Sequence, residues 1–311
     1  MPAVHVRVIV NPVASSMTER RRAAIVESLG TQHTIETVFT QARGHARELA
    51  AGAAADAVDV VVVASGDGTL NEAADGLIGT STALAPLPAG STNVFARSVG
   101  YGNRLDRATD RLLAALDRGS IRRIGVGAAN GRHFLFHLGA GFDAAVVDRI
   151  ERNPRVKRYA AHPAFALQTV RLLARGYDRR VPAVHVESPE ASASHDSFFT
   201  VVSNVTPYTY LGPRRMLLTP AASLDRALAV TSLTRFGLLD VAGAIGSSIG
   251  RAARLQHADS IVQLADVHEL RLTATRPGRP FPWQVDGEYL GTVDDLAVRY
   301  VPDALSVVLP A

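Results

Sequence analysis

The stretch Val58–Glu72, VDVVVVASGDGTLNE, constrains the fold more than any other part of the chain. Its apolar first half has the length and the β-branched composition of a buried strand. A glycine turn, Ser65–Thr69, follows directly, and Leu70–Leu77 has the pattern of a helix start. A buried strand, a tight turn and a helix in this order predict a parallel sheet covered by helices, with the turn at its carboxyl edge.

The same turn carries a chemical signal. Backbone N–H groups of a glycine turn before a helix bind phosphate, but a carboxylate such as Asp67 would repel it. The conflict disappears if a cation lies between them, or if the carboxylate orients a hydroxyl for phosphoryl transfer. The turn lacks the third glycine of the dinucleotide-binding fingerprint, where Asn71 stands, and no Walker lysine follows. The pattern therefore indicates a kinase rather than a dehydrogenase.

Strands and helices alternate through the first part of the chain, from Val4 to about Ile121. Alternation of this kind predicts a parallel sheet with helices on both faces and ligand-binding loops at the carboxyl ends of the strands. We assign residues 1–122 to this nucleotide-binding domain. Strands are expected at 4–10, 34–39, 58–64 and 82–86, and helices at 17–29, 43–54, 70–77, 93–99 and 105–118.

Strand-like segments dominate after Arg122, which predicts an antiparallel sandwich as a second, β-rich domain over residues 123–311. The last segment of that domain can pack back on the first. The polar stretch Ser188–Asp196 is expected to be a surface loop. Strands are expected at 123–128, 132–138, 181–187, 198–204, 227–233, 269–274, 283–285, 296–301 and 305–309, and helices at 143–152, 163–176 and 237–254.

Composition narrows the class of protein. A length of 311 residues leaves room for two domains, and an apolar fraction of 47% supports a full core in each. The absence of cysteine excludes disulfides and thiolate metal sites and fits a reducing compartment. No uncharged apolar run reaches membrane-spanning length, so we expect a soluble protein.

Small and polar residues follow three successive strands of the first domain, in the loops Asn11–Ser16, Ser65–Glu72 and Pro88–Asn93. A fourth such loop, Val285–Glu288, lies far along the chain. Because the carboxyl ends of parallel strands meet at one edge of a sheet, the first three loops should converge. Each loop alone is compatible with an ordinary turn. Together they favour a phosphate-binding site.

Five segments occur in a fixed order: Asn11-Pro12, Ser65-Gly-Asp-Gly-Thr-x-Asn-Glu72, Pro88-x-Gly-Ser-x-Asn-x-Phe-Ala-Arg97, Gly139-x-Gly-Phe-Asp-Ala144 and Asp286-Gly-Glu288. This ordered set resembles the diacylglycerol kinase catalytic-domain family, in the bacterial lipid kinase branch, which is related to sphingosine and ceramide kinases. The resemblance runs over nearly the whole chain. It implies an α/β plus β fold, in which a parallel-sheet nucleotide-binding domain like that of phosphofructokinase and NAD kinase precedes a β-sandwich domain.

The resemblance also implies roles for particular residues. Asp67 would support the magnesium-bound phosphates of ATP, and Asp286 or Glu288 would be the general base that takes the proton from a lipid hydroxyl. Asp143 would lie near the lipid headgroup, with Arg97 as a second substrate residue, although Asp143 is equally compatible with a helix N-cap. ATP would be held by Asn11, Pro12, Thr40, Ser65, Gly66, Asp67, Gly68, Thr69, Glu72, Gly90 and Ser91.

The chain departs from the family pattern after Pro220. Relatives commonly have Asp-x-Gly-Leu-Asp there, near a structural metal. Asp225 is kept here, but Ala227 and Ala229 replace the glycine and the second aspartate. Asp225 is therefore the one residue of this stretch that is kept as a candidate ligand for a structural metal.

The resulting expectation is an ATP- and Mg²⁺-dependent kinase that converts diacylglycerol to phosphatidic acid. Another acceptor such as a sphingoid base, an NAD kinase, and a catalytically silent nucleotide- or lipid-binding protein stay open as alternatives.

The expected partner is a lipid at the membrane surface. The protein would be cytoplasmic and peripheral to the inner face of the membrane, where the basic residues between Arg149 and Arg158 are suited to anionic lipid. Aromatic and basic residues are not interleaved as in nucleic-acid-binding proteins, so no nucleic acid is expected. A homodimer is compatible with the sequence.

Overall fold

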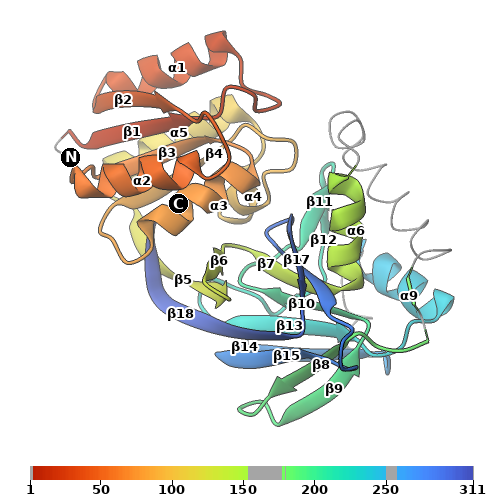
Figure 1. Cartoon of the computed structure of the whole chain (residues 1–311). Helices are drawn as coiled ribbons and strands as arrows, with labels where there is room; N and C mark the ends of the chain where they lie inside the picture. The colour runs from red at the N-terminus through yellow and green to blue at the C-terminus, as the bar shows by residue number, and fades with distance from the viewer. Residues whose placement is uncertain (1–2, 153–176, 179, 250–257, 311) are drawn as a thin grey trace. The chain divides into compact units, whose positions relative to one another are not determined.

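A computed structural model describes residues 3–152, 177–178, 180–249 and 258–310 (Figure 1). The chain divides into two compact units. The first combines Met1–Val126 with Pro302–Ala311, and the second is Gly127–Val301. Among the helices that the structure describes, none is long and apolar enough to cross a membrane.

The first unit is built on a parallel sheet with the strand order β2-β1-β3-β4-β18. The parallel register pairs Val6 with Val60, Val61 with Leu84, and Leu84 with Val307. Its elements are β1 (His5–Val10), α1 (Glu19–Gly30), β2 (Thr34–Phe39), α2 (His45–Ala55), β3 (Val60–Ser65), α3 (Asp67–Leu77), β4 (Ala83–Pro88), α4 (Val94–Ser98), α5 (Leu105–Asp117) and the end of β18 (Asp295–Val308).

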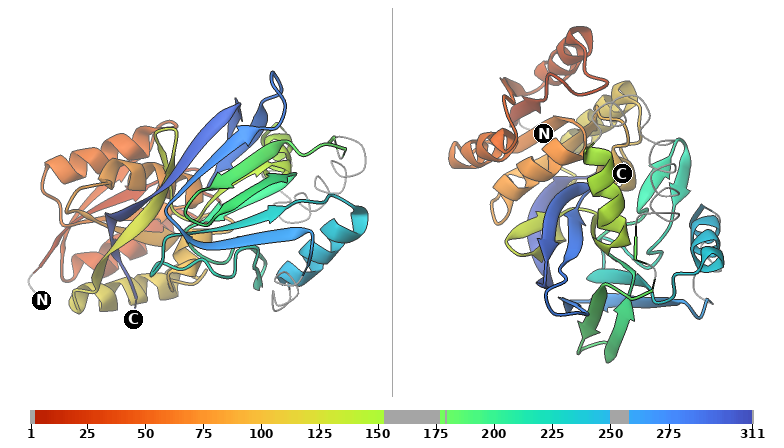
Figure 2. Two further views of the ribbon diagram at one scale, coloured as in Figure 1. Left: turned by 90° about the horizontal axis from the view of Figure 1, so that it is seen from below. Right: turned by 45° about the vertical axis from the view of Figure 1, so that its right-hand side comes forward.

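The central strands of this sheet are buried along their whole length. Every residue of β3 and β4 is buried, as the valine run predicted. Figure 2 shows helices on both faces of the sheet. Strands that lose all contact with water on both faces need continuous apolar side chains, which explains why β3 has no polar alternation.

The second unit contains two layers of antiparallel strands. One sheet has the order β14-β13-β10-β7-β16-β17, and the other contains β18-β15-β8-β9. Its elements are β5 (Ile121–Ala129), β6 (Arg132–Phe134), β7 (His137–Gly141), α6 (Phe142–Glu151), β8 (Val184–Ser188), β9 (Ala193–Ser197), β10 (Phe199–Ser203), β11 (Thr209–Leu211), β12 (Arg214–Met216), β13 (Leu228–Leu233), α9 (Leu238–Ile249), β14 (Ile261–Val267), β15 (Glu269–Ala274), β16 (Phe281–Val285), β17 (Glu288–Val293) and the first part of β18; β5 begins in the first unit.

The core of this unit lies between the two sheets. Val186 and Leu272 come from one sheet, and Val202, Val230 and Trp283 come from the other; all five belong to one buried cluster. Side chains from two sheets that share one apolar layer define a β-sandwich. The predicted fold class, α/β followed by an antiparallel sandwich, is confirmed.

Three local predictions were wrong. The expected loop Ser188–Asp196 is largely a hairpin, because β9 pairs with β8 and its half-exposed edge position needs no apolar alternation. The expected strand 132–138 is two strands, since the N–H groups of Leu135 and Phe136 bind a side chain and not a neighbouring strand. The expected strands 296–301 and 305–309 form the single strand β18, which continues through the expected break. Asp303, with a φ of 46°, lies at that position.

The strands β11, β12, β14 and β17 were not predicted. The expected helix 163–176 and the end of the helix 237–254 lie outside the described residues.

Candidate active site

Three loops of the first unit meet at the carboxyl edge of its sheet, as their positions after neighbouring strands predicted. The Asn11 side-chain amide donates to the Thr69 hydroxyl over 3.1 Å and thereby joins the first loop to the second. The Ser16 N–H donates to the Ala89 carbonyl over 3.0 Å, which joins the first loop to the third. The Ala89 N–H in turn donates to the Ser65 carbonyl over 3.0 Å. The three loops therefore form one hydrogen-bonded structure.

Two glycines let the second and third loops touch. A Cβ atom on Gly90 would lie 2.5 Å from the Gly66 Cα, and one on Gly66 would lie 3.3 Å from the Gly90 Cα. No larger residue at position 90 would fit without moving backbone. A Cβ on Gly68, by contrast, meets no atom within 4 Å among the described residues. Packing inside the described protein thus explains Gly66 and Gly90, but it does not explain Gly68.

Asp67 links the glycine turn to the short helix α4. It is the first residue of α3, and its carboxylate accepts the Val94 N–H at 2.9 Å and the Phe95 N–H at 3.2 Å. These two N–H groups lie in the first turn of α4, where the side chain of the N-cap residue Asn93 makes no capping hydrogen bond. The Asp67 carboxylate binds them instead. Burial raises the pKa of the Asp67 carboxyl, while those backbone donors and the charge of Arg97 act in the opposite direction.

Asn93 is a positioning residue that the sequence analysis did not select. Its backbone is left-handed, with a φ of 53°. Its side-chain oxygen accepts the Gly90 N–H at 2.8 Å, and its amide donates to the Gly90 carbonyl at 3.0 Å and to the Asn103 side chain at 2.7 Å. Asparagine tolerates this backbone conformation better than most residues, so an Asn at the end of a glycine loop was the available signal.

The remaining predicted ATP residues lie on or near the same loops. Pro12 and Ser91 are exposed, and Thr40 and Glu72 are partly buried. The Thr40 N–H donates to the Val10 carbonyl at the end of β1, so Thr40 also lies at this edge. Arg97, a predicted substrate residue, donates to the Thr92 carbonyl at 3.3 Å. The contacts of these side chains with ATP stay predictions.

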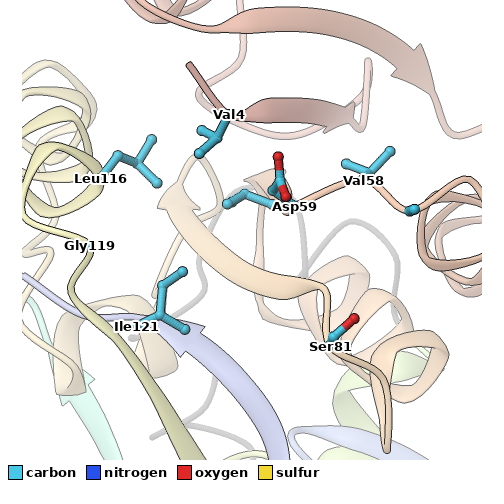
Figure 3. Close-up of a pocket in the computed structure, with 9 residues that line it drawn as sticks. Val4, Val58, Asp59, Ser81, Leu116, Gly119 and Ile121 are labelled. Atoms are coloured by element: carbon cyan, nitrogen blue, oxygen red, sulfur yellow. The ribbon is translucent and has the colours of Figure 1, made fainter. Parts of the chain in front are cut away.

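A hollow of about 490 Å³ in the first unit lies elsewhere (Figure 3). Its lining includes Val4, Asp59 and Ser81, which precede β1, β3 and β4. Because the strands are parallel, these residues mark the amino edge of the sheet, opposite to the three loops. The hollow is therefore separate from the candidate site.

In the second unit, Asp286 is held by backbone. Asp286 and Gly287, with φ values of 48° and 80°, form the two-residue turn between β16 and β17. The Asp286 carboxylate is buried and accepts three N–H groups of the segment between β6 and β7. The donors are Leu135 at 2.7 Å, Phe136 at 3.0 Å and His137 at 2.9 Å.

Glu288 follows immediately but has a different environment. Its carboxylate accepts the guanidinium of Arg132 over 3.1 Å, and its side chain is 17% exposed. One partner of Glu288 is thus a side chain from β6.

Asp143 is not a helix N-cap, since Gly141 occupies that position in α6. Its buried carboxylate accepts the Tyr208 hydroxyl and, at 2.7 Å, the Gln284 side-chain amide. Burial raises its pKa. A Cβ on Gly139 would lie 1.7 Å from an Asp143 carboxylate oxygen, so the glycine makes room for this buried group. Contact between Asp143 and a lipid headgroup stays a prediction.

Two further predictions concern the second unit. Asp225 interacts with Ser223, and the described part of the chain brings together no group of three or more histidine or acidic side chains suited to a metal. Its role as a metal ligand stays a prediction. In the basic cluster, Arg155, Lys157 and Arg158 lie outside the described residues.

Comparison with known proteins shows what the first part of the chain is similar to. The model of the diacylglycerol kinase catalytic domain matches residues 5–129. A "Diacylglycerol kinase" of Bacillus subtilis (strain 168) is 32% identical over 140 residues, 43% of this chain and 45% of that protein. A "Probable lipid kinase YegS-like" of Pseudomonas aeruginosa (strain UCBPP-PA14) is 37% identical over 130 residues, 41% of each chain. These matches span less than half of either relative.

Solved structures extend the likeness in fold to the whole chain. A crystal structure of a diacylglycerol kinase from Bacillus anthracis str. Sterne superposes with a TM-score of 0.71 at 17% identity and covers 98% of this chain and 96% of that one. A yeast NADH kinase superposes with a TM-score of 0.54 at 10% identity, covering 100% of this chain and 84% of the kinase. The diacylglycerol kinase catalytic domain, residues 5–129, contains all three converging loops, whereas Asp286 and Glu288 lie beyond it.

Proposed function

We propose that this protein is an ATP-dependent lipid kinase, which transfers the γ-phosphate of ATP to a lipid hydroxyl, with diacylglycerol as the acceptor. The observation that carries the proposal is the joining of the three loops at the carboxyl edge of the first unit, with Gly68 open to a ligand. The match of residues 5–129 to the diacylglycerol kinase catalytic domain supports the same reaction class.

The loop cluster is suited to phosphate. The start of α3 directs backbone N–H groups toward the glycine turn, and the positive end of the helix dipole lies there. A ligand phosphate can approach Gly68 closely because no described atom fills the space its side chain would take. Asn11 and Thr69 add an amide and a hydroxyl at the same place.

The cluster also suits magnesium. Mg²⁺ prefers oxygen ligands and is usually held by one or two carboxylates together with substrate phosphates. Asp67 lies in the turn itself, and Glu72 lies about one turn further along α3. The carboxylate oxygens of Asp67 have further lone pairs beyond those used by Val94 and Phe95. Mg²⁺ would neutralise the charge that develops on the phosphates during transfer.

We assign the general base to Glu288 rather than Asp286. A lipid alcohol is a poor nucleophile at neutral pH, and a carboxylate must take its proton during the attack. Three backbone N–H groups bind both oxygens of the buried Asp286 and hold its carboxylate in one orientation. Glu288 is more accessible, and its partner Arg132 is a movable side chain. Asp286 would then hold the loop in place.

A lipid panel tests the proposal. Full-length protein is incubated with radiolabelled ATP, Mg²⁺ and mixed micelles that contain diacylglycerol, sphingosine or ceramide, and NAD is tested as a soluble acceptor. Labelled phosphatidic acid is the expected product. Label on a sphingoid lipid alone would keep the lipid kinase and reject the acceptor. Label on NAD alone, or binding of ATP with no labelled product, would overturn the proposal.

Matched variants test the donor site. Gly68→Ala should fold normally, because its Cβ meets nothing in the described protein, but it should weaken ATP binding at least tenfold by crowding the phosphates. Gly243→Ala, in α9 of the second unit, is the control, since its Cβ would also meet no atom of the described residues within 4 Å. Equal ATP affinity in the two variants would show that the phosphates of ATP do not bind at the loop cluster.

A second pair of variants tests the base. Glu288→Gln should lower kcat by a factor on the order of 10²–10⁴ with little loss of stability. Asp286→Asn should mainly destabilise the second unit, because an amide cannot accept three N–H bonds as a carboxylate does. Full activity of Glu288→Gln would refute the assignment of the base.

A further inference from the structure

Arg132 occupies a position that its hairpin determines closely. Asn130 and Gly131, with φ values of 45° and 77°, form a two-residue turn in which Ala129 pairs with Arg132. The backbone of Arg132 is therefore fixed one residue after a tight turn. From this position its guanidinium reaches Glu288 over 3.1 Å, and the Arg132 side chain is 34% exposed.

The chain after Arg132 holds the other carboxylate of the same loop. Leu135, Phe136 and His137 donate their N–H groups to Asp286, and the Asp286 N–H donates back to the His137 carbonyl at 2.9 Å. Residues 132–137 thus contact both acidic residues of the turn between β16 and β17. The backbone bonds fix where the turn lies, and the Arg132 guanidinium contacts the Glu288 side chain directly.

We propose that Arg132 is a positioning residue, which orients the Glu288 carboxylate and keeps it ionised until it takes the proton of the acceptor hydroxyl. The proposal rests on the proposed function, in which Glu288 is the base. A purely structural ion pair is the alternative, and a half-exposed pair of that kind adds little to stability. The positioning role and the structural role differ in their effect on the protonation of Glu288. Only the positioning role requires the charge of Arg132 to make the Glu288 carboxylate harder to protonate.

The test measures that behaviour directly. The side-chain carboxyl carbon of Glu288 is followed by NMR through a pH titration in the wild type, Arg132→Gln and Arg132→Lys. Loss of the charge should move the titration midpoint up by about 0.5 to 1 pH unit. In Arg132→Lys the midpoint should stay close to the wild-type value, because lysine keeps the positive charge although it lacks the planar fork of arginine. Arg271→Gln is the control, since Arg271 pairs with Asp295 elsewhere in the same unit.

The kinetic counterpart is the pH dependence of kcat/KM for the lipid acceptor. In Arg132→Gln the acid limb should move up by the same amount as the midpoint, while KM for ATP stays unchanged. The control variant should change neither quantity. Lysine at position 132 should recover the acid limb but not the full kcat, because orientation by the fork is lost.

The outcomes separate the two proposals. An unchanged Glu288 midpoint in Arg132→Gln overturns the positioning role, whatever the activity. A shifted midpoint with an unshifted acid limb also overturns it and, in addition, shows that Glu288 is not the base. A shifted midpoint in a protein that phosphorylates no lipid supports the contact between Arg132 and Glu288 and refutes the proposed function alone.

Discussion

Two buried titratable groups in the second unit should have opposite effects on stability as the pH changes. Burial raises the pKa of Asp143 above its ordinary value of 3.8. Burial lowers the pKa of His137 from 6.5 to about 3. Both side chains contact Tyr208, through a hydrogen bond from its hydroxyl to Asp143 and through ring packing at 4.5 Å with His137.

The sign of each effect follows from proton linkage. Above pH 3.8 unfolding releases a proton from Asp143, so its contribution to the free energy of unfolding falls by up to about 1.4 kcal/mol per pH unit until the folded-state pKa is passed. Between about pH 3 and pH 6.5 unfolding lets His137 take up a proton, so its contribution rises by a similar amount per unit. Where the two pH ranges overlap, the two contributions oppose each other in the wild type.

Asp143→Asn should expose the slope of His137. The asparagine oxygen can accept the Gln284 amide, and its own amide can donate to the Tyr208 hydroxyl, so both contacts survive without the buried charge. The free energy of unfolding of the variant relative to the wild type should therefore rise with pH, by at most about 1.4 kcal/mol per pH unit, until the folded-state pKa of Asp143 is passed. Urea unfolding at pH 4.5 to 7.5 measures this, with the fluorescence of Trp283, the only tryptophan, reporting on the core of the second unit.

Thr219→Val is the matched control. The Thr219 hydroxyl is buried in the same unit and donates to Ser203 at 2.6 Å, but it does not titrate in this range. Its change in stability should be the same at every pH. The reasoning would be refuted if the difference in free energy of unfolding between Asp143→Asn and the wild type were also independent of pH. Such a result would mean that Asp143 has the same pKa in the folded and unfolded chains.

Two further predictions concern the first unit. Gly90→Ala should destabilise it by about 1–3 kcal/mol, because the new Cβ would lie 2.5 Å from the Gly66 Cα; chemical unfolding followed by circular dichroism checks this, and wild-type stability would contradict the packing. Asp67→Ala should leave the N–H groups of Val94 and Phe95 without their acceptor and speed their hydrogen exchange, whereas Asp67→Asn keeps one acceptor and should lose less protection. Equal exchange in all three proteins would show that Asp67 does not hold α4.

Predictions from the sequence succeeded where local chemistry determines structure. The valine run is a buried strand as predicted, and the glycine turn after it marked the edge where the loops meet. The predicted start of the helix at Leu70 was wrong, because α3 begins at Asp67, within the predicted turn. Strand boundaries at half-exposed edges failed, because polar strands such as β9 carry no periodic apolar signal.

Partners that are distant in sequence could not be predicted. Asp67 was assigned to phosphate because of its immediate neighbours, yet its carboxylate also binds α4, 27 residues away. Asp286 and Glu288 were equivalent candidates for the base, and only the amides of residues 135–137 and the side chain of Arg132 distinguish them. A turn sequence specifies its own backbone, but it does not specify which distant donors fold against it.

The use of β18 in the first unit has a consequence for the order of folding. β4 pairs with Val307, the Tyr101 hydroxyl donates to the Val308 carbonyl, and the Gly79 N–H donates to the Ala304 carbonyl. At a synthesis rate of 5–20 residues per second, the residues of the second unit separate these partners by roughly 10 to 40 s.

During that interval the nascent first unit presents an unpaired apolar strand edge, which is a template for association with other chains. The sheet of the first unit is therefore completed only after the second unit has been synthesised, when β18 covers the open edge of β4.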